Sequence, residues 1–195
     1  MQVKNKSDKV LNEHTSFKLW LKSKFKRRKT ESWKKFLPKA GAVLAVILVG
    51  GGYFMARYEI VYDPQEIKCI PEYDIYLLDK WDKKIERDNI YVFHARNTEP
   101  VFEAGTKLMK FARGMPGDKV EVTPDSYEVK VNDVMLFDGL PLAERLEKEH
   151  DSFVVEGTLS DKNYWFFGTS NLSFDSRYWG AVNEEQIIGR AYPLF

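Results

Sequence analysis

The chain has 195 residues, 44% of them hydrophobic and 30% charged, which is enough for one domain of ordinary size with an appendage. The net charge of +1 hides a division: residues 1–39 hold 13 Lys or Arg and 3 Asp or Glu, whereas residues 40–195 hold 17 basic and 26 acidic residues. One Cys excludes an internal disulfide, and three scattered His give no zinc-site spacing, so we expect no metal and no other cofactor.

The basic segment is followed by an apolar one, which predicts a membrane anchor. Residues 40–56 carry no charge, and as a helix they reach about 26 Å, close to the roughly 30 Å hydrocarbon core. We predict a basic head over residues 1–36 and a transmembrane helix over residues 37–59. A soluble core helix leaves the preceding cations unexplained, and a cleavable signal peptide has a much shorter basic region.

The excess of cations before the span also predicts its orientation. Positive residues stay on the cytoplasmic side, so the N-terminus is expected in the cytoplasm and residues from about 58 onward across the membrane. The lipid bilayer is then the partner of the basic head, and we expect no nucleic-acid partner.

Beyond the span, short alternating segments bounded by turn residues predict strands. Asp63-Pro64 and Ile70-Pro71 favour an extended connection over residues 58–71, Pro116-Gly117 a type II turn, and Asn132-Asp133 a hairpin turn. Residues 142–150 predict one short helix. The expected strands are residues 75–78, 90–93, 107–111, 119–122, 127–131, 134–137, 152–156, 164–167 and 186–192. The fold class is mostly β, an antiparallel domain carried by one N-terminal transmembrane helix.

Two segments carry the most informative patterns. Residues 110–118 (KFARGMPGD) match the pattern Lys-Arg-x-x-Gly-x-Pro-Gly-Asp at every fixed place except the Arg. Residues 173–180 (SFDSRYWG) match Ser-x-Asp-Ser-Arg-x-x-Gly, although Thr169-Ser170 replace the Asp-Asn that would follow Gly168. Both patterns resemble those of type I signal peptidases that use a serine–lysine dyad, in particular the conjugation-associated TraF-type branch, which processes pilins.

The resemblance implies a site in which Cys69 stands where the family has its nucleophilic serine. Lys68-Cys69-Ile70-Pro71 aligns with the family's Ser-x-Pro, and no serine lies between Tyr58 and Arg113. Lys110 corresponds to the family's general base. A lysine accepts a proton when burial favours its neutral form, or it stays charged and stabilises a thiolate. Either state would support an acyl-enzyme, here a thioester.

The resemblance also assigns three supporting residues. Ser173 corresponds to the serine that holds the lysine amine, and Asp175 and Arg177 to a pair that braces the site. The oxyanion hole of the family uses the N–H of the nucleophile and a hydroxyl two residues before it. Ile67 occupies that second place, so one donor is missing or comes from elsewhere.

These assignments predict a membrane-anchored endopeptidase of the bacterial inner membrane, with residues 60–195 as a periplasmic signal-peptidase-like β domain. It would cut a signal or leader segment from a secreted or membrane-inserted precursor, after a small residue. A conjugative pilin is the expected precursor, with hydrolysis or cyclisation as the outcome, and the conjugation or secretion apparatus is a further expected partner. Two alternatives are a general secretory signal peptidase and a non-catalytic peptidase-like scaffold that binds pilus or secretion components.

Overall fold

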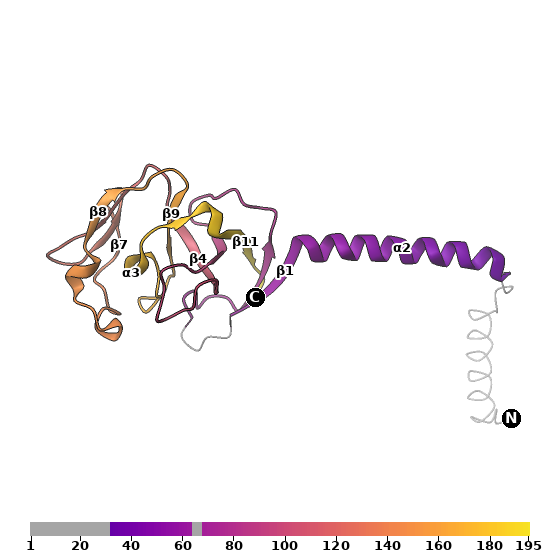
Figure 1. Cartoon of the computed structure of the whole chain (residues 1–195), viewed down its shortest axis with the longest axis horizontal. Helices are drawn as coiled ribbons and strands as arrows, with labels where there is room; N and C mark the ends of the chain where they lie inside the picture. The colour runs from indigo at the N-terminus through magenta and orange to yellow at the C-terminus, as the bar shows by residue number, and fades with distance from the viewer. Residues whose placement is uncertain (1–31, 64–67) are drawn as a thin grey trace, which may run out of the picture. The chain divides into compact units, whose positions relative to one another are not determined.

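The computed structural model describes residues 32–63 and 68–195, so most of the predicted basic head lies outside the described residues. The chain divides into two compact units, residues 1–50 and 51–195 (Figure 1). The second unit holds the strands and all five predicted site residues. It is therefore the part of the chain that positions the candidate site.

The apolar segment forms one helix, α2 (Trp33–Arg57), of 25 residues. None of its residues is buried, and its most apolar window has a mean hydropathy of 1.7. At 1.5 Å per residue it reaches about 37 Å, enough to cross a bilayer. By length and composition, one N-terminal apolar helix is thus compatible with a membrane anchor.

The helix ends at Arg57, two residues before the predicted boundary, because the next residue already pairs with a strand. Tyr58 lies opposite Asp79 in the antiparallel ladder of the first two strands. Arg57 donates to both carboxylate oxygens of Asp79, with Nη2 2.6 Å from Oδ2. This contact lowers the pKa of Asp79 below its ordinary value, against the opposing effect of burial. Tyr53 packs edge-on against Trp81 at 5.3 Å between ring centroids.

The body contains two antiparallel sheets. The larger has seven strands in the order β1-β2-β11-β3-β4-β9-β10, and the smaller has four in the order β7-β6-β5-β8. The strands of the larger sheet are β1 (Tyr58–Tyr62), β2 (Ile75–Asp79), β3 (Ile90–His94), β4 (Lys107–Gly114), β9 (Asn163–Phe167), β10 (Val182–Asn183) and β11 (Ile187–Pro193). The strands of the smaller sheet are β5 (Lys119–Val122), β6 (Val129–Val131), β7 (Val134–Phe137) and β8 (Val155–Thr158). The mostly β, antiparallel fold predicted from the sequence is confirmed.

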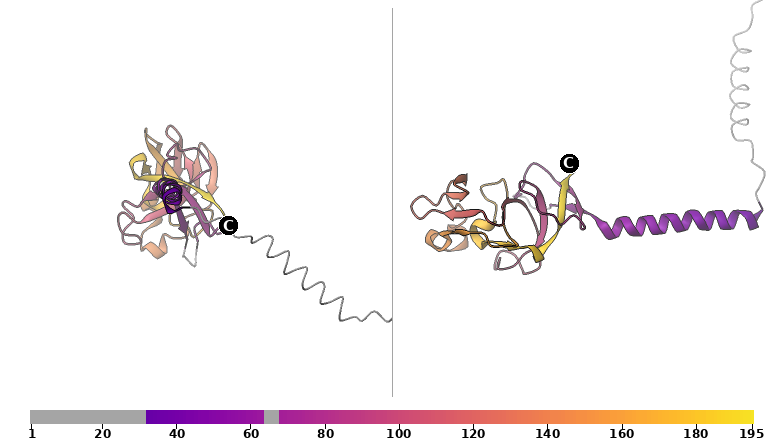
Figure 2. Two further views of the ribbon diagram at one scale, coloured as in Figure 1. Left: turned by 90° about the vertical axis from the view of Figure 1, so that its right-hand side faces the viewer. Right: turned by 90° about the horizontal axis from the view of Figure 1, so that it is seen from above.

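The smaller sheet is inserted between β4 and β9 and lies at the end of the body away from β1 (Figures 1 and 2). Strand β11 lies between β2 and β3 and pairs with both. Among the strands of the described residues, β11 is the one that joins the β1–β2 pair to the rest of the larger sheet. Gly189 allows this close approach, because a Cβ there would lie 2.9 Å from the carbonyl carbon of Asp79.

Both predicted turns are present. Asp118 N–H donates to the Met115 carbonyl at 3.0 Å, and Gly117 between them has φ +87°, as the third position of a type II turn requires. Asn132 and Asp133 have φ of +50° and +63° between β6 and β7, which is the type I′ geometry that matches the twist of a hairpin. These turns fix the ends of β4 and β6.

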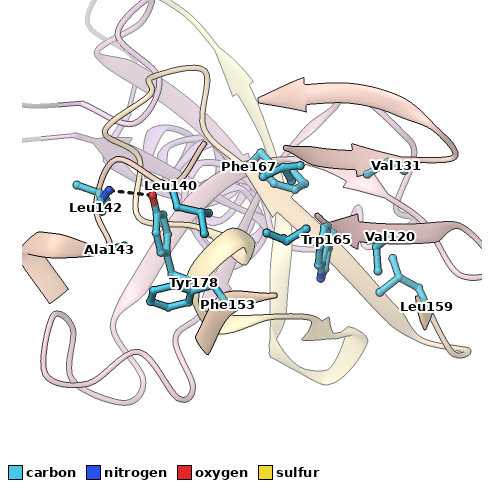
Figure 3. Packing of buried hydrophobic residues seen from close by; sticks show 12 residues of the cluster. Val120, Val131, Leu140, Leu142, Ala143, Phe153, Leu159, Trp165, Phe167 and Tyr178 are labelled. Atoms are coloured by element: carbon cyan, nitrogen blue, oxygen red, sulfur yellow. Dashed lines mark hydrogen bonds between the residues drawn. The ribbon is translucent and has the colours of Figure 1, made fainter. Parts of the chain in front are cut away.

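Aromatic and branched side chains fill the space between the two sheets. Trp165 and Phe167 on β9 pack with Val120, Val131 and other valines of β5 and β6 (Figure 3). The larger sheet buries both faces of β3, where Tyr91 and Phe93 alternate with Ile90 and Val92. The core therefore surrounds β4 and β9, the two strands that lead into the candidate site.

The predicted helix over residues 142–150 is wrong. Two short 3-10 turns stand there instead, η1 (Glu144–Leu146) and η2 (His150–Phe153). Glu147 between them has φ +53°, a left-handed conformation that ends helical hydrogen bonding. A nine-residue helix has little stability of its own, and here burial of Leu142 and Ala143 decides the backbone path.

Candidate active site

Cys69 lies in the connection between β1 and β2, on a loop that the core holds in place. Its neighbour Ile70 is 1% exposed and packs in the cluster of β2 and β3. The Cys69 carbonyl accepts hydrogen bonds from Thr169 N–H at 2.9 Å and Ser170 N–H at 3.2 Å, while the free thiol residue stays partly exposed. Ile67, which the sequence placed in an oxyanion position, lies outside the described residues.

Lys110 lies in the middle of β4 and is 2% exposed. It is opposite Tyr91 of β3, and the alternation of the strand puts its side chain on the face that carries Leu108 and Ala112. Met109 and Phe111 pack on the opposite face. Lys110 is therefore carried at a buried position of the sheet instead of a solvated strand face.

The structure brings Cys69 and Lys110 together. Both line one pocket of about 250 Å³, although 41 positions separate them in the chain. The walls of this pocket come from the end of β1, the start of β4 and the loop before β4. The full lining is Val61, Tyr62, Asp63, Cys69, Phe102, Thr106, Lys107, Leu108, Met109 and Lys110.

Gly168 is the point where the segments of the site meet. Strands β4 and β9 are antiparallel, and Phe111 lies opposite Phe167. One residue further along this register, Gly168 lies opposite Lys110. A Cβ at Gly168 would overlap the Ser173 hydroxyl and lie 2.5 Å from the Cys69 carbonyl oxygen. Glycine is required here because three pieces of chain converge without room for a side chain.

Ser173 is fully buried at this junction, and its Oγ has no hydrogen-bond partner within the described residues. A buried hydroxyl without a partner carries a free-energy penalty of about 1–3 kcal/mol. The structure places Ser173 beside Gly168 and the Cys69 carbonyl, without a formed hydrogen bond to Lys110. Its predicted role in holding the lysine amine stays a prediction.

Asp175 and Arg177 form a fully buried ion pair behind this junction. Arg177 Nε and Nη2 each donate to Asp175 at 2.8 Å, and Nη2 also donates to the Ser173 carbonyl at 2.9 Å. Asp175 accepts from Gly168 N–H at 3.2 Å and caps α3 (Ser176–Trp179) by accepting from Arg177 N–H. The guanidinium lies 3.9 Å from the ring centroid of Phe137. The pair therefore fixes Gly168 and Ser173 without reaching the pocket itself.

One contact that sequence reasoning missed ties the Cys69 loop to the segment after β9. Thr169 Oγ1 donates to both carboxylate oxygens of Glu72 at 3.0 Å, next to the two backbone bonds that reach Cys69. Thr169 was noted only as a departure from the family pattern. That departure was the available indication that Thr169 has a role of its own in this chain.

We expect Gly168→Ala to lower the free energy of unfolding by about 1–3 kcal/mol, because the added methyl group overpacks the junction. The same change should displace the Cys69 loop and reduce any activity that depends on it. Gly157→Ala is the matched control, since a Cβ at Gly157 meets nothing within 4 Å. Thermal unfolding of the two variants, followed by tryptophan fluorescence, measures the difference. Equal midpoints would contradict the packing at Gly168.

Asp118 organises the turn that follows β4. Its carboxylate accepts from Met115 N–H at 2.6 Å, from Asn132 Nδ2 at 2.7 Å and from Arg87 Nη2 at 2.8 Å. Burial alone would raise the pKa of Asp118, but these three donors hold it below its ordinary value. The carboxylate thus stabilises the fold in its charged form.

Asp118→Asn is expected to lower the free energy of unfolding at pH 7 by about 1–3 kcal/mol, through loss of charge-assisted hydrogen bonds. Because the folded pKa is depressed, this contribution is complete above the ordinary aspartate pKa of about 3.9 and disappears as pH falls through the lower folded pKa. The wild-type and variant stabilities should therefore converge below about pH 4. Chemical unfolding across this range is the measurement, and a constant difference would refute the assignment.

The described residues also bear on other kinds of site. Among residues 32–63 and 68–195, no group of three or more His, Cys, Asp or Glu is placed to hold a metal ion. A larger cavity of about 590 Å³ lies between β8 and α3, and neither Cys69 nor Lys110 lines it. The functional groups that the candidate site contains are the Cys69 thiol, the Lys110 amine and the Ser173 hydroxyl.

One family model matches most of the chain. The family model described as "Signal peptidase, peptidase S26" matches residues 33–195, which include the apolar helix, both sheets and every predicted site residue. A curated protein from Synechocystis sp., named "Probable signal peptidase I-2", is 27% identical over 177 residues, covering 89% of this chain and 78% of that protein. A crystal structure of a signal peptidase I from Enterococcus faecalis V583 matches with 24% identity and a TM-score of 0.35, covering 56% of this chain and 97% of that one.

Proposed function

Because the chain belongs to the signal peptidase family, peptidase S26, and is thereby a peptidase hydrolase, we propose that it removes signal segments from precursor polypeptides through a Cys69–Lys110 dyad. The observation that carries the proposal is the common pocket of these two residues. Cys69 carries a free, partly exposed thiol, and Lys110 is a buried residue of the strand that lines the same pocket.

The chemistry follows from the two groups. The Cys69 sulfur attacks the carbonyl carbon of the peptide bond, and the thiol proton passes to the Lys110 amine. The C–N bond then breaks, the leaving amine takes the proton from Lys110, and a thioester remains on Cys69. Water attacks the thioester, Lys110 accepts its proton, and the thiol is restored as the new carboxyl end departs.

Three further residues hold these groups in position. Ser173, buried at the junction and lacking a partner among the described residues, can accept a hydrogen bond from the Lys110 amine once the substrate excludes water. The Asp175–Arg177 pair keeps Ser173 and Gly168 in register by direct hydrogen bonds. A site held by buried groups with several hydrogen bonds to the surrounding chain loses little freedom during the reaction.

The helix α2 supports a membrane location for this activity. Its 25 residues expose only apolar surface between the terminal cations, and the preceding segment is strongly basic. We place the N-terminus in the cytoplasm and residues 60–195 in the periplasm of a bacterial inner membrane, by the distribution of positive charge. Precursors would meet the site as they emerge from the bilayer.

Two substrate classes are compatible with this site. The curated relative is named as a signal peptidase I, which favours general secretory precursors. The sequence Cys69-Ile70-Pro71, with its close spacing of nucleophile and proline, favours the conjugation-associated branch and thus a pilin precursor. Aminolysis of the thioester by the amino end of a pilin would close a ring, whereas hydrolysis would release two ends.

A direct test uses the purified full-length protein in detergent micelles with a secretory precursor and a conjugative pilin precursor. We expect a new amino terminus after a small residue in at least one of them, identified by mass spectrometry. A pilin product lighter by one water than the linear form would indicate cyclisation. Absence of cleavage in both precursors, with the protein folded, would reject the proposed function.

A further inference from the structure

Cys69 also lines a second pocket, whose lining does not include Lys110. This pocket has a volume of about 240 Å³ and shares Cys69 and Phe102 with the first pocket. Its walls come from the loop before β4, from the η1 region and from the segment between β9 and α3. The lining is Cys69, Val101, Phe102, Leu142, Arg145, Leu146, Leu172 and Phe174.

The lining has an unusual combination of properties. All members except Cys69 and Arg145 are hydrocarbon side chains, and Arg145 is the only charged one. Within residues 32–63 and 68–195, the Arg145 guanidinium has no ion-pair or hydrogen-bond partner. Residues 40–195 carry more acidic than basic side chains. Arg145 is therefore not one of many cations in a generally basic surface. An unpaired guanidinium beside an apolar pocket fits a ligand with a carboxylate next to a nonpolar group.

Arg145 is held at the pocket by a firmly anchored turn. The preceding residues Leu142 and Ala143 are buried, and Leu142 N–H donates to the Tyr178 hydroxyl at 3.1 Å (Figure 3). Tyr178 belongs to α3, directly after the Asp175–Arg177 pair that fixes the site. The position of Arg145 relative to Cys69 is therefore set by the same element that holds Gly168 and Ser173.

The size and connection of the pocket indicate its occupant. A volume of about 240 Å³ is below the roughly 300–1,000 Å³ typical of small-molecule sites, but it suits one or two side chains. Because Cys69 forms part of its wall, residues next to a peptide bond attacked by the Cys69 sulfur lie close enough to enter the pocket. A polypeptide segment satisfies both conditions.

We propose that Arg145 is a specificity-determining residue that selects precursors with an acidic side chain close to the cleaved bond, beside a small or nonpolar residue seated in this pocket. The inference rests on the proposed peptidase function and deepens it by naming a substrate class. Binding a Glu or Asp side chain pairs the guanidinium and leaves the apolar wall to the neighbouring residue.

The test uses full-length protein in neutral detergent and a set of quenched-fluorescence peptides. All peptides share one cleavage segment, and each peptide has Glu, Gln or Lys at a single position. Together the peptides cover every position on both sides of the cleaved bond. At one or two positions we expect Glu peptides to show a kcat/KM about fivefold above Lys peptides, the scale of a partly exposed ion pair. Arg145→Glu should invert this ratio, and Arg145→Gln should bring it close to one.

Arg96→Glu is the matched control, since Arg96 is also exposed and lines neither pocket. It should leave the Glu-to-Lys ratio as in the wild type. The unfolding midpoints of the two Arg145 variants show whether each variant is folded. If Arg145→Glu does not fold, the conservative Arg145→Gln variant still provides the test. Two results would overturn the inference: an unchanged ratio in the Arg145 variants, or a preference that appears only when phosphatidylglycerol replaces phosphatidylcholine in added vesicles. The latter would assign Arg145 to anionic lipid.

Failure of this inference is distinguishable from failure of the proposed function. If Cys69→Ala abolishes cleavage of every peptide while Arg145→Glu leaves the ratio unchanged, the peptidase assignment stands and the specificity assignment does not. If cleavage persists in Cys69→Ala, the nucleophile assignment is wrong, whatever the ratio shows.

Discussion

Cys69→Ala is expected to reduce precursor processing by about 10⁴-fold or more, because it removes the atom that would form the acyl-enzyme. The change deletes one sulfur from a partly exposed residue whose loop is held through its backbone carbonyl and by Ile70. The fold should therefore remain intact, with an unfolding midpoint close to that of the wild type. Initial rates with a fixed precursor, in membranes and in micelles, measure the effect.

Cys69→Ser separates the role of the nucleophile from that of the thiol. A hydroxyl at this place restores the family pattern, so this variant should retain measurable processing. It should also become insensitive to N-ethylmaleimide, which is expected to inactivate the wild type in proportion to alkylation of its single Cys. Processing by Cys69→Ala at wild-type rates would show that the chain uses another nucleophile or that another protein cuts the precursor.

Lys110→Met is expected to reduce processing by about 10²–10⁴-fold, the usual contribution of a positioned acid or base. Methionine has a similar length and shape, so it fills the space beside Leu108 and Ala112 without the amine. Replacement of a 2%-exposed lysine by an apolar side chain should leave stability unchanged or raise it, since the amine no longer has to be desolvated. Loss of activity without loss of stability identifies a functional residue.

Lys130→Met is the control for this variant. Lys130 is carried on β6, in the smaller sheet, and pairs with Glu128 at 2.6 Å. It is outside both pockets that Cys69 lines, so processing should stay near the wild-type rate. If Lys110→Met both unfolds the protein and retains specific activity in its folded fraction, Lys110 is a structural residue and the dyad is wrong.

The parts of the fold that local pattern decides were predictable. Strands such as β3 and β9 consist of consecutive aromatic and branched residues, and the turns at Gly117 and Asn132-Asp133 follow from residues that tolerate positive φ. Cys69 and Lys110 were paired because their segments resemble the nucleophile and lysine segments of signal peptidases, and both residues line one pocket. Their chemistry stays a prediction until the variants above are measured.

Other features of the fold depend on contacts between residues that are distant in the sequence, and such contacts cannot be predicted from a local sequence pattern. The segment 142–150 has helical spacing, but the bond from Leu142 N–H to the Tyr178 hydroxyl and burial of its first residues set its path. Strand β10 has two residues and forms only because β9 offers an edge. The link between Glu72 and Thr169 joins positions 97 apart and arises only once the sheet has formed.

The placement of β11 has a consequence for synthesis of the protein. The β1–β2 pair carries the thiol and β3–β4 carries the amine, and β11, which the ribosome makes after both, lies between them and hydrogen-bonds to each. A nascent chain that lacks residues 187–193 has no strand to join the β1–β2 pair to β3. We therefore expect ribosome-bound chains stalled before Ile187 to lack the common pocket of Cys69 and Lys110, which protection of Cys69 from alkylating reagents would measure.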